Sequence, residues 1–126
     1  MEQSAIEQEI KSKAKEWVEE YGADFLVELI DVYLEDTPNR LAQMRQAFAG
    51  GDNETLCREA HTVKSSSANV GAMSLAALAR EIEAAAQMGK VDGADEKARR
   101  IDENFQLVKL TLAAVRKAAV ENNAEF

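Results

Sequence analysis

Apolar residues recur along this chain at intervals of three and four, the spacing that places side chains on one face of an α-helix. At about 100° per residue, one such stripe consists of Leu56, Ala60, Val63, Ser67 and Val70, in which Ser67 is the only polar member. A second stripe with the same spacing lies nearer the C-terminus and consists of Ile101, Phe105, Val108, Leu112 and Val115. No segment shows the convincing alternation of a half-buried strand. The pattern therefore predicts an all-α protein.

Turn and capping residues divide this pattern into six expected helices. They cover about residues 4–22, 24–36, 38–49 and 53–69, the stretch between Gly71 and Gly89, and the stretch after the loop 90–93. Thr37 and Pro38 suit the cap and the first position of the third helix, so the second helix is expected to break there. We expect helices three to six to form an up-and-down antiparallel four-helix bundle, with the additional N-terminal helices packed across it, in a single domain over residues 1–126.

Composition and charge narrow the functions that such a bundle can have. The 126 residues carry 15 Lys and Arg against 23 Asp and Glu, a formal net charge of −8, which disfavours nucleic acid as a partner. No apolar run approaches the roughly 18 residues that span a bilayer, and the first residues lack the layout of a signal peptide. Cys57 is the only cysteine and cannot form an internal disulfide. We therefore expect a cytoplasmic monomer with no membrane partner.

The only histidine of the chain, His61, lies on the helix expected over residues 53–69. It is about 140° away from Leu56 of the buried stripe, so its imidazole should point to solvent. An exposed imidazole is largely neutral at pH 7, which leaves one ring nitrogen with a lone pair to act as a nucleophile. Lys64, one turn further on, would place a positive charge beside any anion attached to that nitrogen. The other neighbours on this side of the helix are Cys57, Arg58 and Ser65, one turn away, and Ala68, two turns away.

The segment around this histidine resembles the motif of histidine-containing phosphotransfer (HPt) domains, in which His-x-Leu-Lys-Gly-Ser-Ser is followed by Gly at the tenth position after the histidine. The positions that match the motif in register are His61, Lys64, Ser66, Ser67 and Gly71. Two positions depart from it. Val63 replaces the usual Leu on the buried stripe, and Ser65 replaces the usual Gly where a partner would pass closest. The second change is expected to affect the choice of partner more than the chemistry.

The resemblance implies a phosphorelay intermediate of a two-component system. In this interpretation His61 accepts a phosphoryl group from the phospho-aspartate of a response-regulator receiver domain and passes it to another receiver, while Lys64 offsets the phosphate charge. A hybrid sensor histidine kinase is a further implied partner. Mg²⁺ would belong to the receiver, so no cofactor and no metal site are expected on this chain.

Three further residues are expected to support the site, in addition to Gly71. Ser65 adds a hydroxymethyl group to the docking side, and Ser66 is expected to form a hydrogen bond near the imidazole or with the helix backbone. Glu83 stands twenty-two positions after His61, where relatives often carry a polar residue, commonly Gln. If Glu83 reaches the imidazole, it would orient the ring and favour its protonated form; otherwise it is a solvated side chain.

Other functions fit the residues less well. The chain shows no Gly-rich nucleotide loop and no acidic cluster placed to hold Mg²⁺, so we do not expect it to phosphorylate itself from ATP. The phosphoacceptor domain of a histidine kinase would have an acidic residue where Thr62 stands. One histidine and one thiol cannot supply a zinc site, and a nucleophilic pair of Cys57 and His61 lacks an orienting group. The main alternative is a non-catalytic helical adaptor that binds receivers without transferring phosphate.

Overall fold

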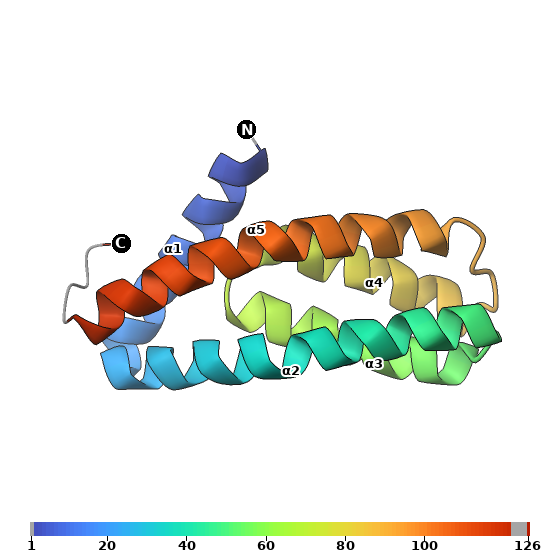
Figure 1. Ribbon diagram of the computed structural model, residues 1–126, viewed down its shortest axis with the longest axis horizontal. Coiled ribbons are helices and arrows are strands. Elements are labelled where there is room, and N and C mark those ends of the chain that lie inside the picture. Colours follow the sequence, from blue (N-terminus) through green and yellow to red (C-terminus); the bar gives the residue numbers. More distant parts are fainter. Residues whose placement is uncertain (1, 122–125) are drawn as a thin grey trace.

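The computed structural model describes residues 2–121 and Phe126 (Figure 1). Five helices account for nearly all of this part of the chain, and it contains no strand. The helices are α1 (Glu2–Tyr21), α2 (Ala23–Gly50), α3 (Asn53–Asn69), α4 (Met73–Gln87) and α5 (Ala94–Val120). None of these helices is long and apolar enough to cross a membrane.

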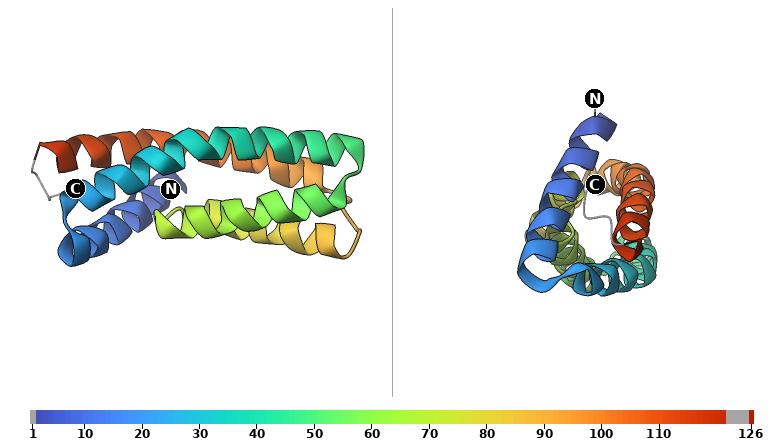
Figure 2. Two further views of the ribbon diagram at one scale, coloured as in Figure 1. Left: turned by 90° about the horizontal axis from the view of Figure 1, so that it is seen from below. Right: turned by 90° about the vertical axis from the view of Figure 1, so that its left-hand side faces the viewer.

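Helices α2 to α5 form an antiparallel four-helix bundle, and α1 packs obliquely across one end of it (Figures 1 and 2). The lengths of the helices explain this arrangement. α2 and α5 have 28 and 27 residues, whereas α3 and α4 have 17 and 15, so the α3–α4 hairpin covers only part of the two long helices. α1 packs mainly against α2 and α5, where it covers the apolar surface beyond the hairpin. The predicted all-α bundle is confirmed.

The expected break before Pro38 is wrong, because α2 continues through this residue without interruption. Proline lacks the N–H that would bond to the carbonyl of Leu34, one turn earlier on the same face. Pro38 is exposed, so this carbonyl lies on the solvent side, where water can take the place of the missing donor. Thr37 is fully buried and does not cap a helix. A single helix therefore precedes the bundle where two were expected.

Because Pro38 sits in a helix interior, its replacement should stabilise the protein. We expect Pro38→Ala to raise the free energy of unfolding by roughly 1 to 3 kcal/mol, since alanine restores the backbone hydrogen bond and only part of the gain is offset by greater freedom of the unfolded chain. Urea denaturation followed by circular dichroism measures this change. A lower free energy of unfolding in the variant would show that the proline fits α2 better than alanine does.

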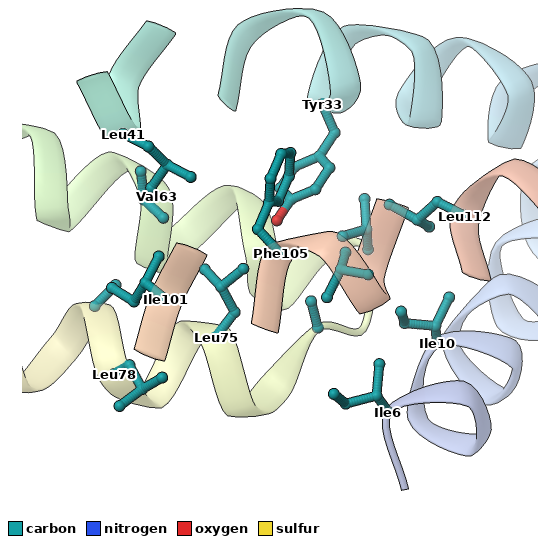
Figure 3. Packing of buried hydrophobic residues seen from close by; sticks show 14 of the residues in the cluster. Ile6, Ile10, Tyr33, Leu41, Val63, Leu75, Leu78, Ile101, Phe105 and Leu112 are labelled. Atoms are coloured by element: carbon teal, nitrogen blue, oxygen red, sulfur yellow. The ribbon is translucent and has the colours of Figure 1, made fainter. Parts of the chain in front are cut away.

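The core is formed by apolar residues from all five helices (Figure 3). Ser67, the one polar member of the α3 stripe, is fully buried within it. Its hydroxyl forms a 2.9 Å hydrogen bond with the hydroxyl of Tyr33 on α2, so neither buried oxygen lacks a partner. Burial raises the pKa of Tyr33 to about 12, which keeps its hydroxyl protonated. The ring of Tyr33 also packs edge-on against Phe105 of α5. Tyr33 therefore connects α2 to both α3 and α5.

Candidate functional site

His61 lies in the middle of α3, on the side of the helix that faces away from the core. The side chain of Asp52 caps α3, because its carboxylate accepts a 3.1 Å hydrogen bond from the N–H of Thr55. Leu56, Ala60 and Val63 are buried, as the stripe predicts. The side chain of His61 is 59% exposed, so a partner can reach the imidazole. A packed helix therefore holds an accessible ring in a fixed place.

A carboxylate from the neighbouring helix α4 contacts this ring. Oε2 of Glu83 lies 2.7 Å from Nδ1 of His61, and Oε1 of the same carboxylate accepts a 2.8 Å hydrogen bond from Nζ of Lys64. The side chain of Glu83 is only 11% exposed. The structure thus brings together three side chains that the sequence singled out, and it decides the open question about Glu83, which reaches the imidazole and is not solvated.

The charges in this cluster determine which ring nitrogen is free. The hydrogen bond from Lys64 lowers the pKa of Glu83, and the hydrogen bond with His61 adds to the effect, whereas burial opposes it. Glu83 is therefore ionised at neutral pH, and an ionised carboxylate only accepts hydrogen bonds. Nδ1 of His61 must carry the hydrogen in this contact. In the neutral imidazole the lone pair is then on Nε2, the nitrogen on the far side of the ring from Glu83.

Ser65 and Ser66, the first two of the three serines after Lys64, form no hydrogen bond with the imidazole. Ser65 is exposed on α3, about 40° around the helix from His61, and so lies on the surface that a partner would approach. Ser66 lies about 140° from His61, and its hydroxyl donates a 3.4 Å hydrogen bond to the carbonyl of Val63 in its own helix. Of the two partners expected for Ser66, the structure therefore shows the helix backbone.

Gly71 lies away from the imidazole, in the turn between α3 and α4, where it packs against α1. Its φ of +85° is in the left-handed region. A Cβ atom at this position would come within 2.8 Å of the carbonyl oxygen of Glu9 and of Cβ of Lys13. Ten residues of helix correspond to about 15 Å, so Gly71 supports the packing of α1 and not the imidazole. Nearby, the indole N–H of Trp17 donates a 2.7 Å hydrogen bond to the carbonyl of Asn69.

One ion pair behind the site, between a buried carboxylate and a half-buried arginine, had no signal in the sequence. Glu59 is buried on the opposite side of α3 from His61, and its carboxylate accepts a 3.0 Å hydrogen bond from Arg40 of α2. These residues are nineteen positions apart and on different helices, so no local spacing relates them. Removing Arg40 would leave the buried carboxylate of Glu59 without this partner, and the pair therefore holds α3 in its place against α2.

Acidic residues, cysteine and histidine do not gather in the described residues into a group of three or more that could hold a metal ion. The other ionisable neighbours of His61 on α3 are Cys57, which is half-buried, and Arg58, which is exposed and donates a 3.5 Å hydrogen bond to the hydroxyl of Thr55. Among the residues that the sequence singled out, Lys64 is thus the cation that the structure places in the cluster with Glu83 and His61.

Comparisons with known proteins bear on the family and the fold. A sequence model of the Hpt domain family matches residues 28–118, well over half of the chain and all of the segment that carries the cluster. A comparison with curated protein sequences gave no match. The fold is similar to the crystal structure of histidine-containing phosphotransfer protein B from Pseudomonas aeruginosa PAO1. The TM-score is 0.73 at 26% sequence identity, and the match covers 86% of this chain and 90% of that one.

The family match and the similar structure support the same role, a histidine phosphotransfer step in a phosphorelay. Hpt proteins are phosphotransfer intermediates without a kinase domain, and they act with the receiver and kinase proteins of two-component systems. This chain belongs to the Hpt domain family.

Proposed function

We propose that His61 accepts a phosphoryl group on Nε2 from the phospho-aspartate of a receiver domain and passes it to the aspartate of a second receiver. The observation that supports this role best is the 2.7 Å contact between Nδ1 and Glu83, because it leaves the outer nitrogen as the nucleophile. The ring is 59% exposed on a helix that is packed on its other side, so it can meet a partner in a defined orientation.

The transfer is a substitution at phosphorus. The lone pair of Nε2 forms a bond with phosphorus while the bond between phosphorus and the aspartyl oxygen breaks, and the aspartate leaves as a carboxylate. The same step in reverse delivers the group to the next receiver. The partner supplies the acidic pocket and Mg²⁺ that hold the phosphoryl oxygens. This chain needs no cofactor of its own and is not expected to react with ATP.

Lys64 would contribute charge to this step. Its ammonium group is held by Glu83 beside the imidazole, and the side chain is 30% exposed. A fixed cation near the incoming phosphoryl group offsets part of the charge that accumulates in the transition state. The hydrogen bond between Lys64 and Glu83 already fixes both side chains, so neither has to lose conformational freedom when the partner binds.

Removing the Lys64 ammonium should slow transfer without unfolding the protein. We expect Lys64→Ala to lower the rate of transfer from a phosphorylated receiver about tenfold, the effect of losing one charge-assisted contact in the transition state. Rapid-quench measurement of phosphoryl transfer gives this rate, and circular dichroism reports the helix content. Arg58→Ala, which removes an exposed cation from the same helix, is the matched control and should transfer at the normal rate. Equal rates in the two variants, or a large loss of helicity in the first, would contradict the role of Lys64.

Incubation with labelled phosphate donors tests the proposed function itself. The purified protein is incubated first with labelled ATP and then with a labelled receiver domain and Mg²⁺. We expect no label from ATP alone and an acid-labile label from the receiver, which a second receiver then removes. A receiver that binds the protein but leaves no label on it would support the alternative role as a non-catalytic adaptor and contradict phosphotransfer.

A further inference from the structure

Glu83 places a full negative charge beside the nitrogen of His61 that does not react. We propose that this charge keeps a proton on Nδ1 after phosphorylation, an inference that rests on the proposed phosphotransfer by His61. The phosphorylated ring is then an imidazolium, and it leaves as neutral imidazole in the onward transfer. Glu83 is then a positioning residue that acts through His61, and it sets how readily this protein gives up its phosphoryl group.

The geometry fixes the carboxylate in the position that this role requires. Oε2 is 2.7 Å from Nδ1, and Oε1 is occupied by the ammonium group of Lys64 at 2.8 Å. The Glu83 side chain is 11% exposed, so little water is available to replace either contact. Turning the carboxylate away from the ring would break the hydrogen bond with Lys64. The oxygen that faces Nδ1 therefore stays there whether or not the ring carries a phosphoryl group.

The charge of the carboxylate affects how readily the phosphorylated ring gives up its phosphoryl group. When Nε2 forms its bond with phosphorus, the hydrogen on Nδ1 remains, and the ring becomes positively charged. An ionised carboxylate stabilises this cation. A ring without the Nδ1 hydrogen would instead direct a lone pair at the same carboxylate, and the two would repel each other. In the onward transfer the bond between Nε2 and phosphorus breaks, its electron pair returns to Nε2, and the ring leaves uncharged. Without the proton the ring would leave as an imidazolate anion, a far poorer leaving group.

The charged groups around the cluster do not provide another source of this effect. Lys64 and His61, both on α3, are the groups that act on the carboxylate of Glu83. On α4, Glu81 is exposed two residues before Glu83, about 160° away around the helix, and Arg80, one turn before Glu83 and also exposed, brings the opposite charge. Arg58 of α3 is also a cation. On the other side of α3, Arg40 of α2 is engaged with Glu59 and Asp36. Glu83 is thus the carboxylate that contacts the ring.

A glutamine at this position would keep the shape and the hydrogen bond with Nδ1, but it removes the charge and the oxygen that accepts from Lys64. Its amide oxygen can accept from Nδ1, so the ring keeps its orientation. Comparison of the protein with Glu83→Gln therefore tests the charge of the carboxylate while the contact with Nδ1 is retained. Glu81→Gln is the matched control, because Glu81 is an exposed glutamate on the same helix. The control removes the same charge from the protein without changing the contact with His61.

The experiment uses phosphoramidate, a small phosphoryl donor that can label His61 without any receiver. Loss of the phosphoryl group is then followed by ³¹P NMR from about pH 7 to about pH 9, and ¹⁵N NMR of the labelled ring reports whether Nδ1 carries a hydrogen. We expect the unchanged protein and Glu81→Gln to keep the Nδ1 hydrogen to higher pH than Glu83→Gln. At the upper end of this range the unchanged protein and Glu81→Gln should lose the phosphoryl group about tenfold faster than Glu83→Gln, because more of their phosphorylated rings still carry the Nδ1 hydrogen.

The outcomes distinguish the role of the Glu83 charge from the proposed phosphotransfer by His61. Identical pH profiles and identical ¹⁵N spectra in the unchanged protein and Glu83→Gln would overturn the role of the Glu83 charge, while transfer from a receiver would be unaffected. A labelled protein that never transfers to any receiver, although its pH profile depends on Glu83, would overturn only the proposed function. Absence of label on His61 would overturn both, because both require a nucleophilic Nε2.

Discussion

His61→Gln is expected to abolish acceptance of a phosphoryl group from a phosphorylated receiver. Glutamine can occupy the place of the exposed imidazole and hydrogen-bond with Glu83, so the fold should be unchanged, but its amide has no nucleophilic lone pair to form a bond with phosphorus. His61 is the only histidine of the chain, so no other imidazole can take over. The measurement is acid-labile label on the protein after incubation with the labelled receiver, which should fall to background.

The control for this prediction is Cys57→Ala. Cys57 is the only thiol of the chain and lies one turn before His61 in the same helix, half-buried. If the thiol were the nucleophile, this variant would lose the label and His61→Gln would keep it. We expect the reverse, with normal transfer in Cys57→Ala. Acid-labile phosphate that persists in His61→Gln would show that the acceptor is another residue.

Gly71→Ala is expected to have the largest effect on stability. The left-handed backbone at φ +85° disfavours any residue with a Cβ, and this Cβ would also lie 2.8 Å from the carbonyl oxygen of Glu9, which belongs to the backbone of α1. A backbone atom cannot move aside as a flexible side chain can, so α1 has to shift as a whole. Strain and overpacking together should lower the free energy of unfolding by about 2 to 4 kcal/mol.

Fluorescence of Trp17 can follow the displacement of α1 directly. It is the only tryptophan of the chain, and its indole N–H bonds to the carbonyl of Asn69 at the end of α3. The control is Gly51→Ala: Gly51 has a similar φ of +70°, but a Cβ there would meet nothing within 4 Å. Gly51→Ala therefore measures backbone strain alone. If both variants lost the same stability and left the fluorescence unchanged, the contact between Gly71 and α1 would not be important.

Local patterns account for much of this protein, because helix formation and burial depend on residues within a few turns. The spacing of Leu56, Ala60 and Val63 predicts which side of α3 is buried, and hence that His61 is exposed. The matching positions around His61 are close enough in sequence to identify the Hpt family. The N-cap at Asp52 is likewise a contact over three residues. All of these features lie within α3 or within two residues of its ends.

Helix ends next to proline were less predictable. Thr37 and Pro38 form a good helix start in sequence terms, yet α2 passes through them. Burial of Thr37 and the neighbouring apolar residues of α2 along the whole bundle outweighs one missing backbone hydrogen bond on the solvent side. Propensity is a local preference of modest size, and the packing of a 28-residue helix against several partners can override it.

The sequence by itself determined the all-α class, the helix that carries His61, the exposure of its ring and the family. The tertiary structure decided that α2 is continuous, that Gly71 serves the packing of α1, and that one carboxylate joins His61 to Lys64. The physical reason is distance along the chain. Glu83 is twenty-two residues from His61, and its contact depends on how far α3 and α4 slide along each other when their apolar faces pack. No spacing within either helix contains that information.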